Sequence, residues 1–239
     1  MRALVLVVAL AGCDRVFGLE STDAQVGNGD ALRVGAGLVA YYPMDELRPT
    51  AAACAPEVIA QRDGNCTDGM PTVVDGHLGK AYSFVPTRDI RVNADGALDP
   101  AHFSVATWIR FHAAPDKSVC PINRGSGPGA DNVWQICFDS ARIVYWVGKM
   151  QFPVNQTFVA DTWYHLALTF DGTMLTGYLD GTLLASGAAI LLPYDNDPMT
   201  LGADLDNGSA DNPIDADLDD VRLYDRPLTT MEVTSLATE

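Results

Sequence analysis

Basic residues are scarce in this chain of 239 residues, which has 15 Lys and Arg against 31 Asp and Glu and a formal charge of −16. Nucleic-acid binding requires basic patches, so this composition excludes nucleic acid as a partner. The chain also lacks an apolar run of the ~20 residues that a membrane-spanning helix needs. Its N-terminal apolar run covers only residues 3–10, so any contact with a membrane must be made in another way.

The N-terminus has the pattern of an exported protein. Arg2 precedes the apolar run and small residues follow it, as in a secretory signal peptide. The sequence LAGC at 10–13 resembles the lipobox of bacterial lipoproteins, in which cleavage precedes a cysteine that carries lipid. We therefore expect a signal peptide at 1–12, lipidation of Cys13, a tether at 13–33 and a periplasmic or surface-facing place in a bacterial cell envelope. The alternative is an ordinary signal peptide with a chance cysteine.

The cysteines do not indicate a zinc site, because the chain has no CxxC pair and its four histidines are scattered. Once Cys13 is set aside an even number remains, which in an exported domain indicates disulfides. Among the possible pairings we favour Cys54–Cys66 and Cys120–Cys137, since each closes a short loop. The second pair flanks a Gly-rich turn that would bring two strands together. Free buried thiols are the alternative.

Signals for helices are nearly absent, and what remains is a pattern of short strands and turns. The Asp-Gly dipeptides at 171–172 and 180–181 predict tight hairpin turns within a meander. One short helical turn is expected near the C-terminus, where Thr229 or Thr230 can cap it ahead of Glu232. Many short strands with regular turns predict an all-β sandwich or jelly roll.

The chain resembles the laminin G-like domains of the concanavalin A-like superfamily. Five blocks occur in the family's order between about residues 37 and 236: GLVAYYPMDE, DGHLGKAYSF, FSVATWIRF, DTWYHLALTFDGTMLTGYLDGTLLASG and LDDVRLYDRPLTTMEV. The resemblance implies one domain at 34–239, an all-β, two-sheet antiparallel jelly-roll sandwich that ends in one short helical turn. It says less about function, because one fold hosts many functions.

Some members of the family hold calcium at a sheet rim, and the resemblance implies the ligands here. They would be Asp45, Asp63, Asn65 and Asp219. Calcium takes six to eight oxygen ligands. Asp219 shares strand parity with Val221 and Leu223, so we expect it to face the core, where a lone carboxylate is costly unless paired or metal-bound. Alternatively, Asp219 accepts backbone hydrogen bonds or pairs with an arginine, and a Cys54–Cys66 bridge staples the loop instead of a metal.

Two further acidic features accompany this set. Asp215 and Asp217 alternate with Asp219, which on a strand would place like charges on one face and lower stability. A metal, a catalytic pair and solvation are the three explanations. The stretch GADLDNGSADNPIDAD at 202–217 fails the EF-hand spacing, and we expect it to be a mobile surface loop.

Catalysis is not expected. Some members of the superfamily hydrolyse glycans with neighbouring glutamates, and that chemistry needs two carboxylates. Only five of the acidic residues here are glutamate, no ExDxxE arrangement occurs, and the five are widely separated: Glu20, Glu46, Glu57, Glu232 and Glu239. No GxSxG elbow is present, and His165 has the setting of a packed strand residue. A pair of aspartates remains open.

A binding module is therefore the leading interpretation, mainly from the resemblance. Sugar recognition stacks aromatic rings on the sugar, and Trp134, Tyr145 and Trp146 are the candidates outside the expected core. Consecutive Tyr145 and Trp146 must face opposite sides of a strand, so at most one of them serves a given surface; all three can also pack inside. The partner would be a glycan or an extracellular or envelope protein, and a purely structural envelope role is the alternative.

Overall fold

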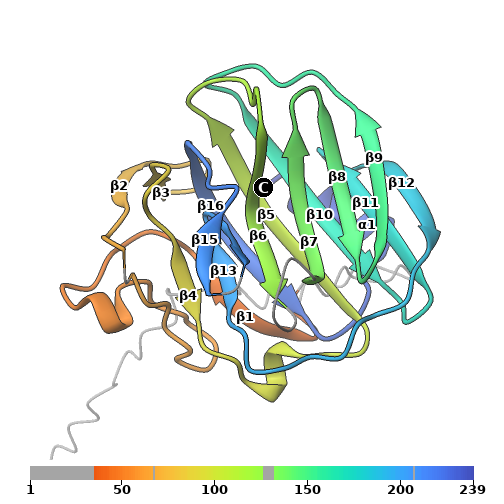
Figure 1. Ribbon diagram of the computed structural model, residues 1–239, viewed down its shortest axis with the longest axis horizontal. Coiled ribbons are helices and arrows are strands. Elements are labelled where there is room, and N and C mark those ends of the chain that lie inside the picture. The colour runs from red at the N-terminus through yellow and green to blue at the C-terminus, as the bar shows by residue number, and fades with distance from the viewer. Residues whose placement is uncertain (1–34, 67, 126–131, 207) are drawn as a thin grey trace, which may run out of the picture. The chain divides into compact units, whose positions relative to one another are not determined.

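A computed structural model describes residues 35–66, 68–125, 132–206 and 208–239 (Figure 1). The expected signal peptide, the lipidation site Cys13 and the tether at 13–33 lie outside these residues. The described chain folds into antiparallel sheets that form a β-sandwich consistent with a jelly roll, which confirms the predicted fold class. No helix in the described ranges is long and apolar enough to cross a membrane.

The larger sheet has eight strands in the order β12-β11-β10-β5-β16-β3-β2, with β1 also paired to β16. Its strands come from both ends of the domain sequence. The last strand, β16, lies between β5 and β3. Their bounds are β1 Leu38–Tyr42, β2 Thr72–Asp75, β3 Lys80–Phe84, β5 Phe103–Phe111, β10 Trp163–Phe170, β11 Met174–Leu179, β12 Thr182–Ala188 and β16 Ala216–Tyr224.

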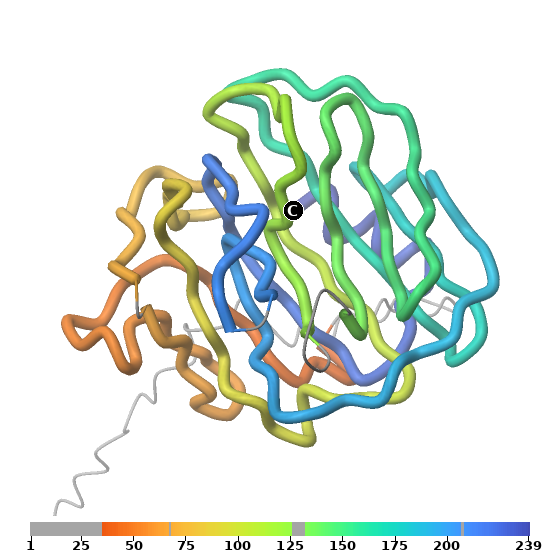
Figure 2. Tube along the Cα trace, viewed as in Figure 1, coloured from red at the N-terminus to blue at the C-terminus, as the bar shows by residue number. Residues whose placement is uncertain are grey.

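The second sheet has six strands in the order β4-β13-β6-β7-β8-β9, and a short hairpin, β14-β15, follows β13. The crossings between the sheets can be followed along the Cα trace in Figure 2. The bounds are β4 Ile90–Val92, β6 Ser118–Gly125, β7 Asn132–Asp139, β8 Arg142–Val147, β9 Met150–Asn155, β13 Met199–Leu201, β14 Asp204–Asp206 and β15 Ser209–Asp211.

The core lies between the two sheets and is filled by alternate residues of their strands. From the larger sheet, Phe103 and Phe111 on β5 are buried. They meet Trp134 and Phe138 on β7, with ring centroids 5.5 Å apart for Phe103–Trp134 and 4.8 Å for Phe111–Phe138. Such tilted and edge-on ring pairs are favoured geometries for buried aromatics.

The predicted turns and the C-terminal helix are confirmed. β10, β11 and β12 form a meander, and Asp180 and Gly181 both have positive φ (49° and 73°) in the two-residue turn. The helix α1 covers Thr230–Leu236, and Thr229 and Glu232 form a reciprocal capping box. Two short 3₁₀ turns, η1 (Ala51–Ala53) and η2 (Gly96–Leu98), precede β2 and β5.

Both predicted disulfides are present. Cys54 and Cys66 close the loop between β1 and β2, with their Cα atoms 6.0 Å apart. Cys120 on β6 and Cys137 on β7 join neighbouring strands of the six-stranded sheet, with Cα atoms 4.1 Å apart. The strands that flank the Gly-rich segment, β6 and β7, pair with each other as expected.

The predicted orientation of Asp219 is wrong, because β16 contains a bulge. The pairing of β16 with β5 shifts between Asp219 and Arg222, and Asp220 has a φ of 58°. An inserted residue reverses the side-chain alternation beyond it. Leu218 and Val221 both face the core cluster, and Asp219 lies on the outer face of the sheet beneath the turn at 76–79.

Candidate functional site

A groove of about 330 Å³ lies on the outer face of the six-stranded sheet. Its floor is built from residues that alternate with core residues on β7, β8 and β9, and strand register places them in two rows. The rows are Gln135, Trp146 and Gln151, and next to them Cys137, Val144 and Pro153. The floor therefore combines one half-buried indole with two amides and a small apolar strip.

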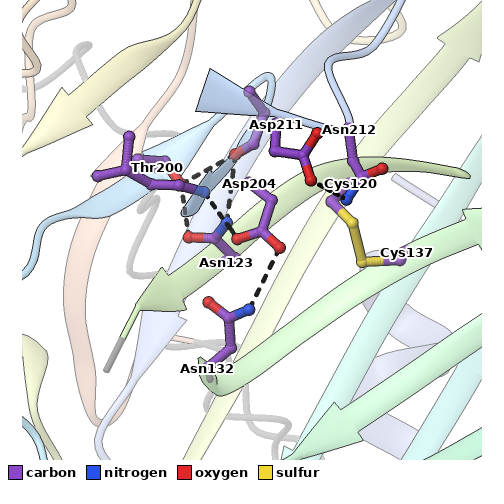
Figure 3. The surroundings of a disulfide bond; sticks show 10 residues. Cys120, Asn123, Asn132, Cys137, Thr200, Asp204, Asp211 and Asn212 are labelled. Atoms are coloured by element: carbon purple, nitrogen blue, oxygen red, sulfur yellow. Dashed lines mark hydrogen bonds between the residues drawn. A yellow bond between two sulfur atoms is a disulfide. The ribbon is translucent and has the colours of Figure 1, made fainter. Parts of the chain in front are cut away.

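One wall of the groove is the β14–β15 hairpin, whose acidic residues line it (Figure 3). Asp204 pairs in register with Asp211, and Asp206 with Ser209. Leu205 between them is buried. The expectation of a mobile surface loop over 202–217 is therefore wrong for this part. The Asn-Gly dipeptide at 207–208 was the overlooked signal, because it is a frequent two-residue hairpin turn.

Asp204 is held by a buried polar network (Figure 3). Its carboxylate accepts hydrogen bonds from Asn123 Nδ2, from Asn132 Nδ2 (3.2 Å) and from the amide of Leu205 (2.7 Å). Thr200 Oγ1 donates to Asn123 Oδ1 at 2.5 Å. Burial raises the pKa of Asp204 to about 6, against the lowering effect of these donors and with a further increase from Asp206 and Asp211. This carboxylate fixes the hairpin to the sheet.

Three polar atoms of the groove-lining residues are shielded from solvent and have no hydrogen-bond partner among the residues that the structure describes: Gln135 Oε1, Trp146 Nε1 and Asp206 Oδ1. Asp206 and Asp211 are diagonal neighbours on one face of the hairpin, and burial together with the charge of Asp211 raises the pKa of Asp206. Unsatisfied buried polar atoms are rare and costly in folded proteins. Other such atoms occur elsewhere in the described residues, Asp219 Oδ1 among them, but these three line one groove. The groove therefore suits a ligand that both donates and accepts.

The structure separates the three aromatic candidates. Trp146 is half-buried on the groove floor, whereas Trp134 and Tyr145 are completely buried in the core. Their proposed role in ligand contact is therefore wrong, and only Trp146 is placed to meet a ligand. Strand parity contained the signal. Trp134 lies on the same face of its strand as Ile136, and Tyr145 lies on the same face as Ile143.

The predicted calcium ligands do not come together. Asp219 Oδ2 accepts the amides of His77 and Leu78, at 2.8 and 2.9 Å, and Asp45 Oδ1 accepts the amide of Lys80 at 2.8 Å. Asp63 instead pairs with Arg48, and the Asn65 amide donates to the Arg91 carbonyl at 3.1 Å. In the described part of the chain, no three His, Cys, Asp or Glu side chains are placed to hold one metal ion. As placed in the structure, this set does not gather the six to eight oxygens that calcium takes, although Asp219 Oδ1 is buried without a hydrogen-bond partner among the described residues.

The two other alternating aspartates are paired with cations. Asp217 meets Arg110 at 2.7 Å and His112 Nε2 at 2.8 Å, and Asp215 meets His112 Nδ1 at 2.7 Å. Burial lowers the pKa of His112, but the bonds to Asp217 and Asp215 outweigh it and the net pKa is raised. The like charges noted in the sequence are therefore compensated on the sheet surface.

His112 also lies beside a hydroxyl, with Ser83 Oγ 3.2 Å from Nε2. A nucleophile, an imidazole and a carboxylate in this order is the arrangement of a hydrolytic triad. Here, however, Nε2 is closer to Asp217 than to Ser83. A ring held between two carboxylates donates from both nitrogens and has no lone pair to accept the proton of Ser83. The arrangement therefore indicates a structural role for His112, which joins Asp215 and Asp217.

Comparison with known families agrees with this architecture. The family model Laminin_G_3, described as "Concanavalin A-like lectin/glucanases superfamily", matches residues 86–234. The chain belongs to this superfamily, which confirms the resemblance read from the sequence blocks. No curated protein matches the chain.

Solved structures share the fold at low sequence identity. Domain 4 of AbnA, a GH43 extracellular arabinanase from Geobacillus stearothermophilus in complex with arabinotriose, has a TM-score of 0.66 and 22% identity over 84% of this chain and 98% of that chain. Trypanosoma rangeli sialidase in complex with sialic acid has a TM-score of 0.68 and 18% identity over 84% of this chain. This chain spans only 33% of the sialidase. The binding domain of Paraclostridial Mosquitocidal Protein 1 has a TM-score of 0.65 and 17% identity, covering 86% of this chain and 52% of that one.

Proposed function

We propose that this protein is a non-catalytic glycan-binding module of a bacterial cell envelope, held at the membrane by a lipid on Cys13. The observation that carries the proposal is the half-buried Trp146 on the floor of a polar groove. An indole supplies the flat apolar surface that stacks on a sugar ring, and sugar hydroxyls both donate and accept. They match the unused Gln135 acceptor and Trp146 donor once these side chains rotate toward the ligand.

Two further observations support binding without catalysis. The groove carboxylate with the most raised pKa, Asp204, is occupied by amide donors and serves the hairpin. Ser83 lies next to an imidazole that two aspartates already hold. A structural relative, the AbnA domain, was solved with arabinotriose, and this favours oligosaccharides as the first ligands to test.

The test is calorimetric titration of residues 34–239 with neutral oligosaccharides, arabinotriose among them, for the unaltered domain and for Trp146→Ala. Loss of stacking is expected to weaken binding about tenfold or more. Trp163→Ala is the matched control, because Trp163 is a half-exposed tryptophan on the other sheet, under the Arg110 guanidinium. Equal affinity of both variants would refute the groove, and release of reducing ends from any bound glycan would refute the non-catalytic role.

A protein partner is the second candidate, and one surface favours it. Met150, Ile190 and Leu192 line an apolar hollow next to β9 and β12, and Ile190 is 80% exposed. Such apolar exposure is typical of protein contacts. Binding of an envelope protein that persists in Trp146→Ala and is lost in Ile190→Ser would support this function instead.

A further inference from the structure

Acidic side chains outnumber basic ones among the described residues that line the groove. Asp206 and Asp211 are diagonal neighbours on one face of the β14–β15 hairpin, and like charges placed in this way repel unless a proton or a cation is shared. Among the described residues that line the groove there are four aspartates and one guanidinium, that of Arg142, which pairs with Asp139. The wall formed by Asp206 and Asp211 is therefore not neutralised from within the groove.

An independent observation points to a ligand from outside. Gln135 is 3% exposed and lines the same groove, and its Oε1 accepts no hydrogen bond from the described part of the chain. An amide oxygen buried without a donor costs free energy. The groove thus offers two unused acceptors, Gln135 Oε1 and Asp206 Oδ1. Asp211 adds an exposed carboxylate, whose Oδ2 also accepts a hydrogen bond from Asn212 Nδ2 at 3.1 Å.

The donor that fits is an ammonium group and not a metal ion. Calcium requires six to eight oxygens, and three acidic, histidine or cysteine side chains placed for a metal are not found in the ranges the structure describes. An ammonium group has three donors and no acceptor, so two carboxylates and one carbonyl satisfy it. Its charge also offsets the repulsion between Asp206 and Asp211.

We propose that the groove selects oligosaccharides that contain a protonated amino sugar, whose ammonium group is held by Asp206 and Asp211 while the ring lies over Trp146. This inference rests on the glycan-binding function proposed above and adds the chemical class of the sugar. The same charges repel sugars that carry carboxylates, so acidic glycans are excluded.

The experiment compares a glucosamine oligosaccharide with its N-acetylated counterpart of equal length, since acetylation removes the charge and keeps the ring. Calorimetry near neutral pH should show at least about tenfold tighter binding of the amine form, as expected for charge-assisted hydrogen bonds. Asp206→Asn and Asp211→Asn should abolish that preference while N-acetylated sugar still binds. Asp116→Asn, an exposed charge outside the groove, controls for the change in net charge.

The outcomes separate this inference from the glycan-binding proposal. Equal affinity for the two sugars, both weakened in Trp146→Ala, would overturn the amino-sugar inference and leave the glycan groove standing. A preference that survives in both aspartate variants would also overturn it. Binding of neither sugar would refute both proposals for these ligands. Competition of calcium with the amine form would show that the wall takes a metal ion, which contradicts the ammonium assignment.

Discussion

Two sets of aspartates differ in whether they have cationic partners: one set lies on the outer face of the eight-stranded sheet, and the other lies on the groove wall beside the six-stranded sheet. On the eight-stranded sheet, Asp217 pairs with Arg110 and Asp220 pairs with Arg222 at 2.6 Å. On the β14–β15 hairpin, Asp206 and Asp211 are diagonal neighbours. The one cation among the described residues that line the groove, Arg142, pairs with Asp139 instead. Buried charges are costly unless they are paired, so the pairs of the buried Asp217 and Asp220 act in stability. Asp206 is only partly buried and Asp211 is exposed, so both are free to act on a ligand.

The outer face of the eight-stranded sheet, the covered face, is stabilised by the segments that pack over it as well as by its ion pairs. His77 stacks on Trp108, with ring centroids 3.5 Å apart, and the helix α1 packs Val233 and Leu236 over Ala106 and Ala167. The groove has no equivalent lid among the described residues, only the single β14–β15 wall. Removing the partner of a charged residue should therefore lower the free energy of unfolding strongly on the covered face and only slightly in the groove.

The largest effect is expected for Arg222→Met. The change leaves Asp220, 4% exposed at its side chain, without its guanidinium, and breaking a buried pair costs about 3–5 kcal/mol of the free energy of unfolding. Arg142→Met is the matched control in the groove, because Arg142 and Asp139 are 45% and 43% exposed and such pairs contribute below about 1 kcal/mol. Urea unfolding with intact disulfides measures both. Equal losses would remove the distinction between the faces.

A smaller difference is expected between two Asp→Asn substitutions. Asp217→Asn weakens the charged hydrogen bonds to Arg110 and His112 and should lower the free energy of unfolding by about 1.5–3 kcal/mol. Asp206→Asn removes one member of a repelling pair and should leave stability unchanged or raise it by a few tenths of a kcal/mol, as roughly expected for opposed like charges. Destabilisation by Asp206→Asn as large as by Asp217→Asn would mean that the groove wall is structural.

Asp219, on the covered face, is expected to make the free energy of unfolding depend on pH. Burial raises its pKa to about 7, against the amides of His77 and Leu78, which lower it. A carboxyl with a raised folded-state pKa stabilises the fold when protonated, and this contribution is lost as the pH rises from about 4 through 7. His165, whose pKa burial lowers to about 3, acts in the opposite direction below pH 6.5.

The comparison of the unaltered domain with Asp219→Asn isolates this group, because His165 is the same in both. The stability of the unaltered domain relative to the variant should fall between pH 5 and pH 8, by at most about 1.4 kcal/mol per pH unit. Urea unfolding at several pH values measures the difference. A difference that does not change with pH would show that Asp219 is ionised throughout.

Local sequence signals predicted much of the fold, and the failures have local causes. The turn at Asp180-Gly181, the capping box at Thr229 and both disulfides depend on neighbouring residues and were predictable. The bulge at Asp219–Asp220 was not, since it places an aspartate at positive φ without the glycine that usually marks such a position. The groove wall was missed because three-residue strands rich in aspartate have little strand propensity. They form where tertiary hydrogen bonds from Asn123 and Asn132 to Asp204 hold them.

The smallest effect is expected from calcium. Its effect on the melting temperature tests whether the covered face is a metal site. Anything that binds only the folded state raises the melting temperature. On this face Asp219 Oδ2 is already occupied by two backbone amides, and Asp63 is paired with Arg48. We expect the melting temperature of residues 34–239 in calcium and in excess EDTA to agree within about 1 °C. A rise of several degrees in calcium that is lost in Asp219→Ala would assign the metal to the covered face, whereas one lost in Asp206→Asn would assign it to the groove.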